Sequence, residues 1–292
     1  MTGSTTTEVQ QGMGGTAAMD TAGMVGRDSW SAGTLDPLPP SAPVDVSSLI
    51  GPDDVADYRR DGVVRVQGVI SRERAEKYRA AADASRRKLV DINGTGMFTQ
   101  VLQVWQFDET MRELTFDPTL ASLAAELTGE PMRLWHDHML IKEPHNDRAT
   151  EFHQDGPLWS YDGAERALSA WVALVDVPVE RGCMTFIPAS QKRTDLRPIN
   201  LADEVDLFVA APEMTWDKRV TIPLKAGDCT FHNAFTGHMA TPNRTDDPRF
   251  AHVVVYAPQS STFNGRKHIV TDPLGLSVGQ TLPDEAFPPL LT

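Results

Sequence analysis

The sequence is poor in cysteine, in basic residues and in long apolar runs. Its two cysteines, Cys183 and Cys229, lie far apart in strand-like runs, so we expect buried, reduced thiols and no disulfide framework. Lysine and arginine number 27 against 40 acidic residues, and the net charge of −13 disfavours nucleic acid or an anionic membrane as partner. No stretch of about 18 apolar residues occurs, and the first residues, MTGSTTTEVQ, show no basic, apolar leader. We therefore expect a soluble, cytoplasmic protein that binds a small molecule.

The first 45 residues also lack apolar periodicity and carry few charges. They are rich in Gly, Thr, Ser, Met and Pro, a composition that cannot bury enough surface to offset the entropy of ordering. We therefore expect residues 1–45 to form a disordered N-terminal tail. Residues 46–292 are enough for one ample core, and we expect a single domain there.

The rest of the chain changes from helical to strand-like patterns near Met132. Pro52 and Gly62 bracket a short predicted helix, Ser71 caps a longer one, and a third ends at Gly129. From Met132 onward, seven short apolar runs separated by turn residues predict a sandwich or a closed jelly roll. Residues 190–217 break this rhythm, and we expect them to be a lid or binding loop.

One candidate metal site stands in TEFHQDGPLW, where His153 and Asp155 are one residue apart. Side chains alternate along a strand, so an HxD pair on a strand aims both groups to the same side. Downstream, His238 adds an imidazole and Arg249 follows at the start of the last long run. Two histidines and one carboxylate with open positions are typical of non-haem iron(II) oxygenases. Arginine suits the far carboxylate of a dicarboxylate cosubstrate.

The order of these motifs resembles the phytanoyl-CoA dioxygenase family of iron(II)- and 2-oxoglutarate-dependent oxygenases. The resemblance runs from about Asp54 to Pro258 and rests on RRDGVVRVQGVI, IKEP, HQD, SAWVALVDVPVERGCMTFIPAS and GHMATPNRTDDPR. It implies a mainly β fold with flanking helices, a double-stranded β-helix, which is a jelly roll of the cupin-like barrel type.

The same resemblance implies the roles of individual residues. His153, Asp155 and His238 would bind Fe(II), Arg249 would bind the distal carboxylate of 2-oxoglutarate, and Trp171 would be a wall of its pocket. The reaction implied uses 2-oxoglutarate and O2, releases succinate and CO2, and oxidises an unactivated C–H bond of a small molecule. Hydroxylation is the default outcome, and desaturation, epimerisation and ring closure stay open because they depend on how the substrate is placed.

Two positions depart from the family pattern. Gln191 stands in PASQ where relatives have PGSH, which we expect to affect a turn more than the chemistry. His138 stands where relatives often place a glutamine that touches 2-oxoglutarate, so we predict the same contact for it. Asp155 is kept, whereas halogenating relatives lose this carboxylate, and we therefore expect oxidation and not chlorination.

Two other functional classes stay open. HDHMLIKE supplies His136, His138 and Glu143, and PLKAGDCTFHN supplies His232, a set that resembles the metal motifs of cupins. A cupin-type metalloenzyme that uses His136, His138 and His232 would not need 2-oxoglutarate. The spacing before His232 fits that pattern only approximately. A non-catalytic binding module is the other alternative, but it would be expected to have lost a ligand of the first site.

The substrate is the least determined feature. We expect a natural-product intermediate or an amino acid, since no acyl-carrier or nucleic-acid signature occurs. No GxSxG or Walker loop is present either. The other basic groups are interpreted as ordinary: His145, His252 and His268 as surface or strand residues, and Lys192, Arg193 and Arg197 as a solvated run or an anion contact from the lid.

Overall fold

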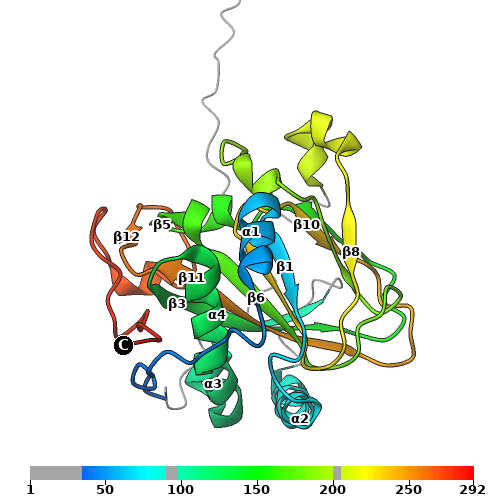
Figure 1. Cartoon of the computed structure of the whole chain (residues 1–292), viewed down its shortest axis with the longest axis horizontal. Helices are drawn as coiled ribbons and strands as arrows, with labels where there is room; N and C mark the ends of the chain where they lie inside the picture. Colours follow the sequence, from blue (N-terminus) through cyan, green and yellow to red (C-terminus); the bar gives the residue numbers. More distant parts are fainter. Residues whose placement is uncertain (1–34, 90–97, 200–204) are drawn as a thin grey trace, which may run out of the picture.

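Two antiparallel sheets face each other in the computed structural model, which describes residues 35–89, 98–199 and 205–292 (Figure 1). In spatial order the large sheet is β1 (Val63–Val66), β9 (Cys229–Asn233), β6 (Leu168–Ala173), β11 (Arg249–Pro258), β3 (Met132–Lys142) and β2 (Thr99–Leu102). The small sheet is β4 (Thr150–His153), β10 (His238–Ala240), β7 (Met184–Phe186) and β8 (Val220–Ile222). A short pair, β5 (Tyr161–Asp162) and β12 (Thr262–Phe263), lies apart from both. The predicted jelly roll is confirmed.

Four α-helices precede β3 in the described part of the chain. Of these, α1 and α4 lie in front of the large sheet in Figure 1. The four helices are α1 (Pro52–Asp61), α2 (Arg72–Leu89), α3 (Glu109–Thr115) and α4 (Pro118–Thr128). The predicted ends at Gly62 and Gly129 are confirmed, because both glycines adopt the left-handed conformation that closes a helix. We did not predict α3, since its seven residues are too short to show a helical period.

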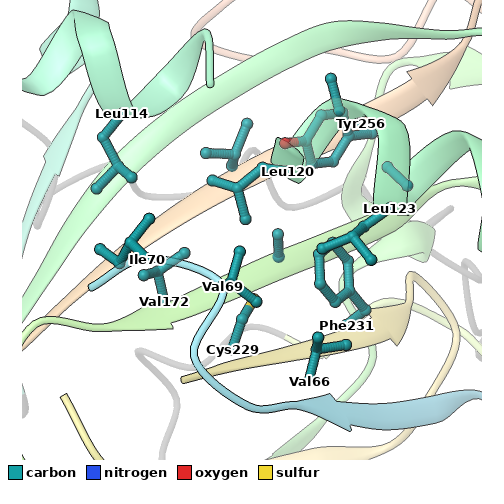
Figure 2. Close-up of a cluster of buried hydrophobic side chains, with 14 of the residues drawn as sticks. Val66, Val69, Ile70, Leu114, Leu120, Leu123, Val172, Cys229, Phe231 and Tyr256 are labelled. Atoms are coloured by element: carbon teal, nitrogen blue, oxygen red, sulfur yellow. The ribbon is translucent and has the colours of Figure 1, made fainter. Parts of the chain in front are cut away.

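The large sheet has an apolar core on each face. On its helical side, Leu120 and Leu123 of α4 pack with Val172 and Phe231 of the sheet (Figure 2). Full burial of each such side chain contributes about 1.5–3 kcal/mol. The second core fills the space between the two sheets and includes Trp171 from the large sheet. The functional cavity opens within this second core.

The chain before α1 contacts the domain farther back than predicted. The amide of Leu35 donates to the carbonyl of Gln106 at 2.7 Å, and that of Ser41 donates to Leu290 at 3.0 Å. The expected disorder therefore does not hold for residues 35–45, whose order comes from backbone hydrogen bonds that apolar periodicity does not reveal. The remaining part of the predicted tail lies outside the described residues.

The described parts of the predicted lid, residues 190–199 and 205–217, supply side chains that pack against the outer face of the small sheet. Leu207 and Met214 are buried there with Phe152 of β4. Phe152 precedes His153 on the strand, so its side chain points away from the side on which His153 lies. The short helices η5 (Ser190–Lys192), η7 (Leu207–Val209) and η8 (Pro212–Trp216) belong to this segment.

The predicted run RVTIPLKAGDCTFHN is divided between the two sheets. Its first part is β8 in the small sheet and its second part is β9 in the large one. Gly227, with a φ of 95°, lies at the turn just before β9. Both cysteines are buried and free, as predicted. No helix in the described ranges is long and apolar enough to span a membrane.

Candidate metal centre and cosubstrate pocket

His153, Asp155 and His238 meet at one end of the small sheet. His153 ends β4, His238 begins β10, and the two residues are paired across these strands. Asp155 lies beyond the end of β4 in a turn, with φ −79° and ψ −44°. The expectation that strand alternation aligns the HxD pair is therefore wrong. The turn, and not the strand, directs the carboxylate toward the imidazoles.

The sequence of this turn fixes the position of Asp155. The amides of Asp155 and Gly156 both donate to the carbonyl of Ala234, at 3.0 and 2.9 Å. The buried side chain of Gln154 donates to the carbonyl of Phe235 at 2.6 Å. A Cβ atom on Gly156 would stand 2.5 Å from the ring of Phe235, so only glycine fits after the aspartate.

The three side chains form the one group of potential metal ligands found among the described residues. Their ligand atoms lie within 4.8 Å of one another. The Nε2 atoms of His153 and His238 are 3.4 and 3.9 Å from the carboxylate oxygens of Asp155. Two ligands bonded at right angles to an ion at about 2.1 Å are about 3 Å apart, so a small closure would accommodate a metal.

Backbone carbonyls determine which ring nitrogens are free. Nδ1 of His153 lies 2.7 Å from the carbonyl of Glu151, and Nδ1 of His238 lies 2.9 Å from that of Thr236. A carbonyl only accepts, so each Nδ1 carries the proton and each Nε2 presents its lone pair. Two imidazoles and one carboxylate, joined by no fourth such ligand in the part of the chain that the structure describes, fit iron(II) with open positions.

The charges of these groups also favour a cation. Burial raises the pKa of the Asp155 carboxyl, but His238 and His153 outweigh this effect and the net shift is strongly downward. Burial lowers the pKa of His238 to about 4. The site therefore holds an ionised carboxylate beside a neutral imidazole, the form in which both groups bind a metal.

Arg249 begins β11 and is 2% exposed, yet no carboxylate within the described ranges forms an ion pair with it. One terminal nitrogen donates to the carbonyl of Leu140 at 3.3 Å, and Nε has no partner. The guanidinium carbon lies 5.2 Å from the centroid of the Trp171 ring. The buried Nε1 of Trp171 is also without a hydrogen-bond partner. A buried, unpaired cation is costly, so these unmet donors fit a bound carboxylate.

A glycine and a lysine surround Arg249. At Gly182, with a φ of 72°, an added Cβ would lie 3.1 Å from Nε of Arg249 and 3.3 Å from Cδ of Lys142. Lys142 donates to the carbonyls of Arg148 and Thr241, both at 2.9 Å. Burial, followed by the repulsion from Arg249, lowers its pKa to about 7. Lys142 belongs to the IKEP motif, for which we predicted no individual role.

One cavity joins the metal ligands to Arg249. His138 and Trp171 line it, as the predicted cosubstrate contacts require. His136, His232 and His268 line it as well. None of the described residues of the predicted lid lines it.

The rival cupin set is not brought together as a metal site. His136 and His138 are adjacent, with 3.3 Å between their Nδ1 atoms, but His232 does not complete a group with them in the part of the chain that the structure describes. Glu143 is directed to the surface, where it bonds to Arg86. The Nδ1 atom of His232 is buried without a hydrogen-bond partner.

Two histidines that we interpreted as ordinary are deeply placed. His268 lines the cavity, where no motif had signalled it, and its ring contacts those of Trp135 and His136. His252 is fully buried on the other side of the large sheet, where its Nε2 lies 2.9 Å from the hydroxyl of Thr115. His145 is exposed, as predicted.

The fold and this site define a non-haem iron(II)- and 2-oxoglutarate-dependent enzyme. The family model for phytanoyl-CoA dioxygenase (PhyH) matches residues 58–251, and the chain belongs to this family.

Solved structures with a similar fold include two enzymes of nogalamycin biosynthesis. The non-heme alpha ketoglutarate dependent carbocyclase SnoK is 33% identical with a TM-score of 0.76, over 86% of this chain and 100% of that one. The epimerase SnoN, in complex with Fe3+, alpha ketoglutarate and nogalamycin RO, is 37% identical with a TM-score of 0.69, over 82% and 97%.

Curated relatives match over shorter lengths. Phytanoyl-CoA dioxygenase domain-containing protein 1 of Mus musculus is 24% identical over 152 residues, 50% of this chain and 52% of that protein. The L-proline trans-4-hydroxylase of Streptomyces griseoviridis is 28% identical over 141 residues, 46% and 53%. The chain thus spans about half the length of these two relatives.

Proposed function

We propose that this protein oxidises a C–H bond of a natural-product intermediate. Iron(II) would be held by His153, Asp155 and His238, and the distal carboxylate of 2-oxoglutarate by Arg249. The observation that carries the proposal is a metal-ligand triad and a buried, unpaired arginine in one cavity. With iron and 2-oxoglutarate bound, such a site supplies the oxidant from O2 and releases succinate and CO2.

The residues of the chain contribute positioning and exclusion of water. The arginine and the indole of Trp171 provide donors at one end of the cavity, and the triad fixes the metal at the small sheet. Binding at both ends would orient a dicarboxylate in one direction, and iron held by the triad would supply the oxidation chemistry at its end of the cavity. We propose that His138 contacts the same cosubstrate, since it lies on the cavity wall.

The charges of the cavity favour a natural-product intermediate over an amino acid. Of the described residues that line it, only Asp155 carries a carboxylate and only Arg249 a permanent positive charge. Both are used by the metal and the cosubstrate in this proposal. An amino-acid substrate would leave its own ammonium and carboxylate without partners, which is costly in a buried site.

Hydroxylation is the simplest outcome, and a second outcome has specific support. The two relatives that are 33% and 37% identical are described as a carbocyclase and an epimerase. Ring closure would remove two hydrogen atoms from the substrate, hydroxylation would add one oxygen atom, and epimerisation would leave the composition unchanged. Mass spectrometry of the product therefore distinguishes the three.

The metal site is tested by anaerobic titration of the protein with Fe(II) and 2-oxoglutarate. We expect a visible metal-to-ligand charge-transfer band, followed by substrate-triggered succinate release when natural-product intermediates are screened with O2. His153→Ala should abolish the band, because it removes a ligand, whereas His136→Ala should keep it. The opposite pattern would transfer the metal to the cupin-type set, and absence of the band in the metal-loaded wild type would refute the proposed function.

A further inference from the structure

Histidine side chains line the end of the cavity opposite Arg249. Along β3 and β11, Arg249 is paired with Lys142, Val253 with His138, and Val255 with His136. The six residue steps from 249 to 255 span about 20 Å, so His136 lies far from the proposed cosubstrate site. His268, from the chain after β12, closes this end. Its ring is nearly parallel to that of His136, at 15°, with 6.0 Å between centroids.

Packing holds these rings in place. The ring of Trp135 contacts His268 at 5.3 Å and stacks on Phe287 at 4.9 Å. Tyr161 meets the same indole edge-on at 4.6 Å. These aromatic contacts restrict the orientation of the His268 ring, so the direction in which its nitrogens point is set by packing.

The hydrogen bonds of the rings determine what they offer a ligand. Nδ1 of His268 accepts from the amide of Val270 at 3.3 Å, so the neutral ring carries its proton on Nε2. In the His136–His138 pair, one Nδ1 donates and the other accepts, which leaves one Nε2–H and one bare Nε2. Burial lowers the pKa of His268 and of His138 to about 4, so both are neutral near pH 7.

We propose that His136 and His268 form the substrate-recognition end of the cavity and select an uncharged ring system with hydroxyl and carbonyl oxygens on one edge. The neutral ring of His268 presents an N–H donor and that of His136 presents its free Nε2, and together they complement such an edge. Leu158 and Trp159, also on the cavity wall, supply apolar contact for the rings of the substrate. This inference rests on the proposed function, since it names the substrate class of the same cavity.

The test uses 7-hydroxycoumarin as a probe, because it carries a hydroxyl and a lactone carbonyl on a flat, uncharged ring system. The control probe is 7-methoxycoumarin, which keeps the shape but cannot donate. Binding is measured by fluorescence titration of the anaerobic protein loaded with Fe(II) and 2-oxoglutarate, whose charge-transfer band is recorded first. We expect the wild type to bind the hydroxy probe about three- to tenfold more tightly, as expected for one hydrogen bond.

Substitutions at His268 separate hydrogen bonding from packing. His268→Phe keeps a ring but removes the donor, and should weaken binding of the hydroxy probe about three- to tenfold. His268→Gln keeps a donor and should remain within about twofold. His136→Phe should act like His268→Phe. The exposed neighbour Lys267 supplies the matched control, Lys267→Gln, which should bind like the wild type.

The outcomes distinguish this inference from the proposed function. If the wild type shows no charge-transfer band, the proposed function fails and the inference falls with it. If the band is present but the holoenzyme binds neither coumarin, or binds both equally, the recognition role is refuted alone. The same holds if His268→Phe binds the hydroxy probe as tightly as Lys267→Gln does. A variant is interpreted only when its own band matches the wild type, which excludes misfolding as the cause.

Discussion

Arg249→Met should have opposite effects on the free protein and on cosubstrate binding. The guanidinium is buried without a carboxylate partner, and burial lowers its pKa to about 9, which shows that the charge is poorly solvated. Methionine has similar length and no charge. Replacing an uncompensated buried cation by an apolar side chain should raise the free energy of unfolding of the ligand-free protein by about 1 kcal/mol or more.

The same change should nearly abolish binding of 2-oxoglutarate. A carboxylate left without its partner in a desolvated pocket costs about 2–5 kcal/mol, which corresponds to a loss of about 30-fold to several thousand-fold in affinity. Arg249→Lys should recover part of this loss, because an ammonium restores the charge but not the planar pair of donors. Iron binding should be spared, since Arg249 is not one of the ligand group.

Urea unfolding with and without 2-oxoglutarate, in anaerobic protein with Fe(II), measures both effects. At a concentration of 100 times the dissociation constant, the ligand stabilises the wild type by about 2.7 kcal/mol. A 100-fold loss of affinity reduces this to about 0.4 kcal/mol in Arg249→Met. Arg244→Met, at an exposed position before β11, is the matched control and should keep the full stabilisation. If Arg249→Met keeps it too, the arginine does not bind the cosubstrate.

Two further predictions concern stability and the segment at residues 190–217. Burial lowers the pKa of His252 to about 3 from 6.5, so below pH 6.5 the unfolded chain binds a proton that the folded protein does not. This group should therefore lower the free energy of unfolding as the pH drops from 6.5 toward 3, by up to about 1.4 kcal/mol per pH unit. Asp137, 3.6 Å from Nε2 of His252, acts in the opposite direction, because burial raises its pKa to about 7. His252→Gln should remove the histidine contribution, so the free energy of unfolding, measured with urea, should fall less between pH 7 and pH 5 than in the wild type. An unchanged pH dependence would mean that other groups cause it. Leu207→Ala should speed proteolysis within residues 190–217, because it removes buried packing that holds the segment. It should leave the charge-transfer band intact, because Leu207 packs outside the cavity. Loss of the band in a folded Leu207 variant would show that the segment supports the metal site.

The class of chemistry and much of the element order could be predicted from the amino-acid sequence alone. A metal site demands particular residue types, so His153, Asp155 and His238 could be selected from one chain. Helix ends at Gly62 and Gly129 could be predicted as well, because capping depends on a few neighbouring residues. These features are local, or chemically so restrictive that few side chains can supply them.

Which residues line the cavity follows from packing between segments that are distant in the sequence. The position of Asp155 depends on hydrogen bonds to Ala234, a residue distant in sequence, and not on strand alternation. His136 and His268 became one surface because packing brings the chain after β12 against β3, and no periodicity in either segment signals the other. The described parts of the segment at residues 190–217 lie on the outer face of the small sheet because buried side chains, such as Leu207, pack there. Contacts between distant segments follow from three-dimensional packing, which a linear pattern of residue types does not encode locally.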